Sequence, residues 1–168
     1  MRVLVPVDTS SPNCDFALKH VVNRFMNDST IEIHLLNVQP KFSHDISRFT
    51  NARTLHEYHR EESEKALRPC MRMLDNFNIP YGVHMEVGDM AECIAETAKR
   101  LHCDEIVMSS AHKNSLVRLV ENSVTNRVLE RSSVPVEVVP GKAESPWERY
   151  GIPAALAGLV ALMFAAAD

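Results

Sequence analysis

Glycine is scarce in this chain of 168 residues. Five glycines are present, and only Gly82 and Gly88 lie within the first 140 residues. A loop that cradles phosphate through its backbone N–H groups needs several residues without a Cβ close together. Neither a Walker loop nor a GxGxxG fingerprint can be drawn around two separated glycines. The sequence therefore excludes the P-loop and glycine-rich dinucleotide-binding classes.

The sequence also lacks the signals of a zinc site, of a nucleic-acid-binding surface and of secretion, which narrows the possible classes of function. The four cysteines show neither CxxC spacing nor clustering with histidine, so no zinc site is indicated. The net charge is −4 and no block of Lys and Arg stands out, which argues against a nucleic-acid partner. The N-terminal residues form an apolar, strand-like run and not a secretory signal. These features predict free thiols in a cytoplasmic protein.

The hydrophobic pattern predicts an α/β protein. Short apolar runs rich in β-branched residues indicate buried parallel strands, and they alternate with segments of helical periodicity. This alternation predicts a doubly wound, five-stranded parallel sheet of the Rossmann-like type. We expect strands at 3–7, 31–38, 81–87, 105–109 and 134–139, and helices at 11–25, 54–77, 90–101 and 123–130, with Asp89 and Ser123 as N-caps.

In such a sheet, ligands bind beyond the carboxyl ends of the strands where the strand order reverses. If the first and fourth strands flank that point, Asp8 and Ser109 line the crevice. An acid directly after the first strand can accept hydrogen bonds from a base amine or a ribose hydroxyl. Capping the first helix is the alternative role for Asp8.

Several segments resemble one family in the same order and spacing. They are the opening run 2–10, the run 104–110, Asn122-Ser123-Val124 and the closing run 134–139. Together they make residues 1–140 similar to the universal stress proteins. The resemblance implies an adenine-nucleotide alpha hydrolase-like fold over residues 1–140 and a role in the stress response.

Family members that bind ATP carry glycine, two residues, glycine, nine residues, glycine and then Ser or Thr. Here Ser109, His112 and Asn122 occupy the three glycine positions, and Ser123 keeps the expected type. Side chains at these positions would project where phosphates approach the backbone, and each lost charge-assisted contact costs about 1.5–3 kcal/mol. The resemblance therefore implies a non-nucleotide branch of the family that needs no cofactor. Because Asn and His tolerate left-handed backbone, an ATP-binding switch that uses Asp8 and residues 109–123 remains the alternative.

No catalytic constellation is visible in the sequence. Ser10 and Ser123 lack a recognisable His and Asp arrangement, so a serine hydrolase is not supported. His56 and His59 lie three apart on a predicted helix, and a solvated or half-buried helix face explains them better than a metal site. We therefore expect a protein that is not an enzyme, with a slow phosphohydrolase as the remaining catalytic alternative.

The last predicted strand bears on assembly. A terminal strand leaves an exposed sheet edge, and Val134–Val139 is apolar enough to need covering. An isologous contact with a second copy satisfies both edges at once, and the family resemblance implies such a homodimer. We expect the dimer to act on a further protein partner that the sequence does not identify.

The C-terminal part differs in character from the rest. Residues 141–150 form a polar linker, and residues 151–167 are seventeen residues without a charge before Asp168. As a helix they span about 25 Å, slightly less than the hydrocarbon core of a bilayer. Trp147 and Tyr150 precede them, where interfacial aromatic residues belong. The segment is predicted to be a hydrophobic helix that either tethers the domain to the cytoplasmic face of a membrane or docks on protein.

Overall fold

The computed structural model describes residues 1–8, 14–42, 51–110 and 124–140. Strands and helices alternate through these ranges, as the sequence predicts. The elements are β1 (Arg2–Pro6), α1 (Cys14–Asn27), β2 (Glu32–Gln39), α3 (Ala52–Asn76), β3 (Tyr81–Val87), α4 (Met90–Arg100), β4 (Glu105–Ser110), α5 (Val124–Arg131) and β5 (Val136–Pro140).

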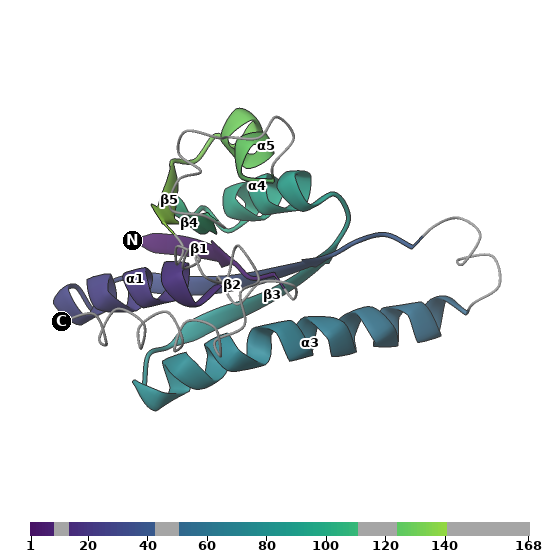
Figure 1. Cartoon of the computed structure of the whole chain (residues 1–168), viewed down its shortest axis with the longest axis horizontal. Coiled ribbons are helices and arrows are strands. Elements are labelled where there is room, and N and C mark those ends of the chain that lie inside the picture. Colours follow the sequence, from purple (N-terminus) through teal and green to yellow (C-terminus); the bar gives the residue numbers. More distant parts are fainter. Residues whose placement is uncertain (9–13, 43–50, 111–123, 141–168) are drawn as a thin grey trace, which may run out of the picture.

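The strands form one parallel sheet with the order β3-β2-β1-β4-β5. β1 lies at the centre, with β2 on one side and β4 on the other (Figure 1). The chain builds outward from β1 first in one direction and then in the other, so the strand order reverses between β1 and β4. This confirms the predicted doubly wound sheet and the predicted switch point.

Helices cover both faces of the sheet, which explains why its central strands are apolar throughout. α1 and α3 lie on one face, and α4 and α5 lie on the other (Figure 1). Successive strand side chains point to opposite faces. Val3 and Val5 therefore pack with residues of α1 and α3, whereas Leu4 between them packs with α4 and α5.

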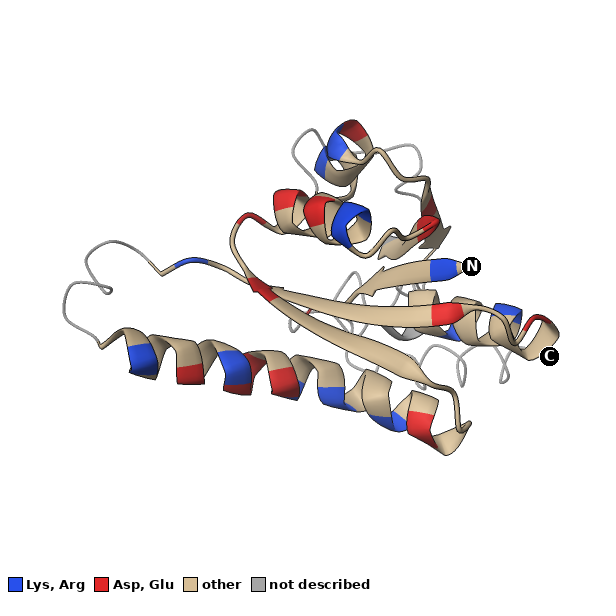
Figure 2. Ribbon diagram, turned by 180° about the vertical axis from the view of Figure 1, so that it is seen from behind, with Lys and Arg blue, Asp and Glu red and all other residues tan. Residues whose placement is uncertain are grey.

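The long helix α3 shows how one face is buried and the other solvated. Its buried residues include Ala66, Leu67, Cys70 and Leu74, which recur at three- and four-residue spacing. Positive and negative side chains alternate along its outer surface (Figure 2), and Arg53 pairs with Glu57 one turn away. The mixed signs give this surface little net charge.

The helix boundaries agree with the local sequence signals. Asp89 caps α4 as predicted, because its side chain accepts a hydrogen bond from the backbone N–H of Glu92 at 3.1 Å. α3 begins two residues before its predicted start, with Asn51 as the N-cap. The predicted N-cap Ser123 and residues 11–13 of the first predicted helix lie outside the described residues.

Within the ranges that the structure describes, no helix combines the length and the apolar character needed to cross a membrane. The polar linker 141–150 and the apolar segment 151–168 both lie outside those ranges.

Candidate functional site: a crevice at the carboxyl ends of the strands

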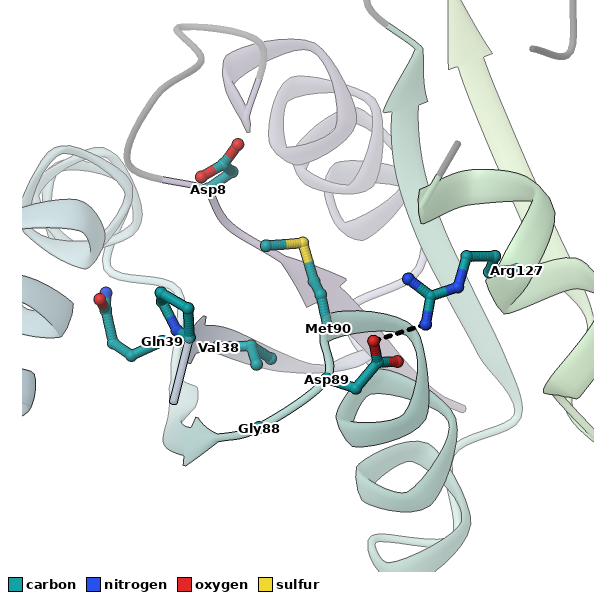
Figure 3. A pocket seen from close by; sticks show the side chains of 8 residues that line it. Asp8, Val38, Gln39, Gly88, Asp89, Met90 and Arg127 are labelled. Atoms are coloured by element: carbon teal, nitrogen blue, oxygen red, sulfur yellow. Dashed lines mark hydrogen bonds and ion pairs between the residues drawn. The ribbon is translucent and has the colours of Figure 1, made fainter. Parts of the chain in front are cut away.

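A cavity of about 550 Å³ opens where β2 and β3 end and α4 begins. It lies at the carboxyl edge of the sheet beside β1, which is where doubly wound proteins bind ligands. Figure 3 shows the side chains around it. The described lining residues are Asp8, Val38, Gln39, Pro40, Gly88, Asp89, Met90 and Arg127.

Two hydrogen bonds made by the buried side-chain amides of Asn37 and Gln39, here called the amide ladder, hold one wall of this cavity in place. The side-chain amide of Asn37 donates to the carbonyl of Val7 at 2.7 Å, and that of Gln39 donates to Oδ1 of Asn37 at 2.7 Å. Both side chains are more than nine-tenths buried, and buried amides are retained only where such bonds are made. The ladder ties the end of β2 to the end of β1. Asp8, which follows Val7, is thereby held near Gln39.

Gly88 sets the close approach of α4 to the end of β3. A Cβ at this position would lie 2.7 Å from Sγ of Cys93, a distance that real Cβ contacts do not show. The backbone N–H of Gly88 also donates to the carbonyl of Gln39 at 2.9 Å. The first residue of α4, Met90, is half-buried and points into the cavity between Asp8 and Asp89 (Figure 3). Its flexible thioether provides an adaptable apolar surface there.

An ion pair closes the far side of the cavity. Arg127, in the first turn of α5, donates from Nη2 to Oδ2 of Asp89 (Figure 3). The Arg127 hydrogen bond, and next the Glu92 backbone N–H, lower the pKa of Asp89 below its ordinary value. The same contact raises the pKa of Arg127. Both partners are therefore charged at neutral pH, and they join α4 to α5.

The structure places the predicted site residues unequally. Asp8 lines the cavity as expected. Ser109 lies near the end of β4, in register with Val139, and is not among the described lining residues. His112, Asn122 and Ser123 lie outside the described residues.

Of the described lining residues, sequence reasoning assigned a site role only to Asp8; it missed the others, among them Gln39, Met90 and the pair of Asp89 and Arg127. Gln39 carried a usable signal, because it is a polar residue at the carboxyl end of a buried strand next to the switch point. Arg127 lies four residues after Ser123 in the sequence, but its pairing with Asp89 depends on how two helices pack.

The lining provides both hydrogen-bond donors and hydrogen-bond acceptors. The carboxylate of Asp8 accepts hydrogen bonds, the amide of Gln39 can do both, and Arg127 donates. No group of three or more His, Cys, Asp or Glu side chains that could hold a metal ion exists among the described residues. His59, one of the two histidines weighed as metal ligands, packs its ring against Phe42 with centroids 4.5 Å apart.

The parallel sheet and its crevice define a Rossmann-like α/β protein. Comparison with known proteins identifies its family. The model of the universal stress protein family matches residues 1–140. The chain belongs to this family, as the sequence resemblance predicts.

Individual relatives agree with this assignment. Universal stress protein MJ0531 of Methanocaldococcus jannaschii is 27% identical over 144 residues, which is 82% of this chain and 81% of the relative. The solved structure of hypothetical protein MJ0577 is 28% identical, has a TM-score of 0.65, and matches over 85% of this chain and 97% of its own. An Arabidopsis thaliana family member solved with AMP bound shares the fold, with a TM-score of 0.62, 17% identity, and coverage of 85% and 93%.

Proposed function

We propose that this chain is a non-catalytic stress-response module that acts through protein contacts and binds Mg-ATP only weakly. The observation that carries the proposal is the replacement of all three phosphate-loop glycines, by Ser109, His112 and Asn122. A Cβ at each position obstructs the close backbone approach that a triphosphate requires. The described lining also lacks a nucleophile placed beside a general base, which supports a binding role over catalysis.

We further propose that the module is a homodimer joined through Val134–Val139. Within the described residues, β5 is an edge strand that pairs only with β4. Its outward N–H and C=O groups need partners, and a twofold contact with a second copy supplies them. The dimer would present its helix faces and the crevice to another protein.

A second candidate function is an ATP-responsive switch. Two observations favour it: Asp8, Gln39 and Arg127 all line the crevice, and solved relatives hold AMP, cAMP or dAMP. In this reading Asp8 binds the nucleoside and Ser123 contacts the phosphates without help from glycine.

Calorimetric titration with Mg-ATP separates the two candidates. The weak-binding proposal expects a dissociation constant no better than millimolar, and a clear gain in affinity when S109G, H112G and N122G are combined. A micromolar constant for the natural sequence, barely changed by the three glycines, would establish the switch. S115G, in the same segment but not at a glycine position of the motif, is the matched control.

We also propose that residues 151–167 tether the domain to a membrane. Their uncharged composition and the preceding Trp147 and Tyr150 support this proposal. Fractionation of the full chain beside a 1–145 truncation, with an alkaline carbonate wash, tests it. An integral anchor keeps only the full chain in the washed membrane. If both forms wash off, the segment packs on protein instead.

A further inference from the structure

Arg127 is the only cation among the described residues that line the crevice. Its guanidinium is engaged with Asp89, and the two meet at the cavity wall opposite Asp8, with Met90 between (Figure 3). A ligand that contacts Asp8 at one end and extends past Met90 therefore reaches this ion pair at its other end.

The ion pair has the properties of an exchangeable contact. The side chains of Arg127 and Asp89 are 32% and 36% exposed, and pairs at that exposure contribute little to stability. Asp89 also accepts a hydrogen bond from the backbone N–H of Glu92, so its carboxylate keeps a partner when Arg127 leaves. Arg127 would exchange the carboxylate of Asp89 for a phosphate of the ligand, since its planar guanidinium can form paired hydrogen bonds with either anion.

Asp89 also affects which ligands the crevice accepts. By formal charge, the two acids Asp8 and Asp89 and the single cation Arg127 leave the described lining with one negative charge in excess. An anionic ligand is repelled unless it takes Arg127 for itself, whereas an uncharged nucleoside is not affected. Asp89 is thus a built-in competitor of the ligand's anionic group.

We propose that Arg127 is an anion-binding residue of the crevice, and that Asp89 and a ligand phosphomonoester compete for it. The inference rests on the crevice being the ligand site proposed above, and it gives that site a regulatory consequence. When phosphate takes Arg127, the tie between α4 and α5 opens. Because α5 leads directly into the edge strand β5, ligand binding is coupled to the proposed protein-contact edge.

The test compares AMP with adenosine on the ¹⁵N-labelled full chain, followed by NMR, which measures millimolar constants. AMP and adenosine differ by the phosphate alone. The natural chain is expected to bind AMP, and the Arg127 ¹⁵Nε–¹H signal should shift with AMP but not with adenosine.

Two substitutions change AMP affinity in opposite directions. D89N keeps the N-cap, since Asn and Asp cap equally well, and frees Arg127, so AMP should bind about threefold more tightly. R127Q removes the charged donor and should weaken AMP binding about tenfold. Adenosine affinity should stay within about twofold in both variants. Because the competition requires Arg127, adding D89N to R127Q should restore none of the lost AMP affinity.

The matched control is E86Q, which breaks the ion pair between Glu86 on β3 and Arg100 at the end of α4; neither residue lines the cavity. It should leave AMP affinity unchanged. If AMP and adenosine bind equally and R127Q affects neither, the crevice is a nucleoside site and the Arg127 proposal is wrong. If neither compound binds, both the inference and the nucleotide-switch function fail, while the weak-binding module stands.

Discussion

The two edges of the sheet carry titratable clusters of opposite chemistry. At the β3 edge, Nδ1 of His34 lies 3.1 Å from Nε2 of His84, and burial lowers the pKa of both rings. At the β5 edge, burial raises the pKa of Glu105, and a hydrogen bond with Glu137 raises it further. The two histidines and Glu105 thus favour their uncharged forms. Partial burial at a sheet edge is sufficient to shift these pKa values. Burial lowers the pKa of a histidine and raises that of a glutamate, so the stability of the fold depends on pH in opposite directions at the two edges.

The edges also differ in how their apolar side chains are covered. On β3, Val83, Met85 and Val87 are 39–45% exposed along one face of the strand. On β5, residues 136–139 are all half-buried, although the strand has no second neighbour among the described residues. Exposed apolar surface therefore marks β3 as the less protected edge, whereas the family resemblance assigns the dimer to β5.

The largest expected effect concerns the proposed dimer. Ile106 donates its backbone N–H to the carbonyl of Pro135, so strand alternation directs the N–H of Val138 away from β4. V138P removes an outward donor while leaving the β4–β5 bonds in place, and should convert the dimer into a monomer. Light scattering after size exclusion of the full chain measures this.

The matched variant is M85P on the opposite edge. Gly88 donates to Gln39, so alternation directs the N–H of Met85 outward from β3 in the same way. This variant should remain dimeric. If M85P dissociates the dimer and V138P does not, the apolar stripe on β3 is the interface and the prediction for β5 is wrong.

The second effect is on stability at the β5 edge. Nη1 of Arg24 lies 2.8 Å from Glu105 and 2.9 Å from Glu137, so one guanidinium serves two carboxylates. R24Q removes the guanidinium shared by the two acids, leaves only His20 at 2.9 Å from Glu137, and should lower the free energy of unfolding by about 1–3 kcal/mol. Chemical denaturation at pH 7 measures the loss. R53Q, which breaks an exposed pair on α3, should cost less than about 0.5 kcal/mol, and equal losses would contradict the argument.

The third effect is a pH dependence that Glu105 introduces. A carboxyl whose pKa is higher in the folded state binds its proton more tightly there, so ionisation destabilises the fold. This contribution is favourable below the ordinary pKa of 4.5 and is lost as pH rises through the higher folded value. E105Q should therefore flatten the fall in stability above pH 4.5. An unchanged pH slope in denaturation curves would contradict the raised folded-state pKa of Glu105.

At the β3 edge the sign reverses. The pKa values of His34 and His84 are lower in the folded state, so the unfolded chain takes up protons first. Their contribution is complete above the ordinary pKa of 6.5 and is lost as pH falls below it. H84N should make the fold less sensitive to acid as the pH falls below 6.5. H56N on α3 is the control, and an equal change in that variant would contradict the assignment.

Much of this organisation follows from the sequence. The sheet was predictable because strands buried on both faces are apolar without interruption, as in Val3-Leu4-Val5. Asp8 was predictable because strand order fixes the switch point. The pairing of Asp89 with Arg127, 38 residues apart, was not, because it depends on how α4 packs against α5. The His34–His84 contact depends likewise on strand register, which apolar runs alone leave open.

The smallest expected effect concerns the apolar stripe on β3 itself. V83T replaces a methyl group with a hydroxyl on a side chain that is 39% exposed, and threonine retains the β-branched shape that strands favour. Surface substitutions of this kind change the free energy of unfolding by no more than about 0.5 kcal/mol. If β3 is a free edge, V83T should therefore alter neither stability nor the dimer, and light scattering with denaturation measures both. A loss of unfolding free energy well above that limit would mean that these apolar side chains are covered in solution. The β3 edge would then be protected, as the β5 edge is proposed to be.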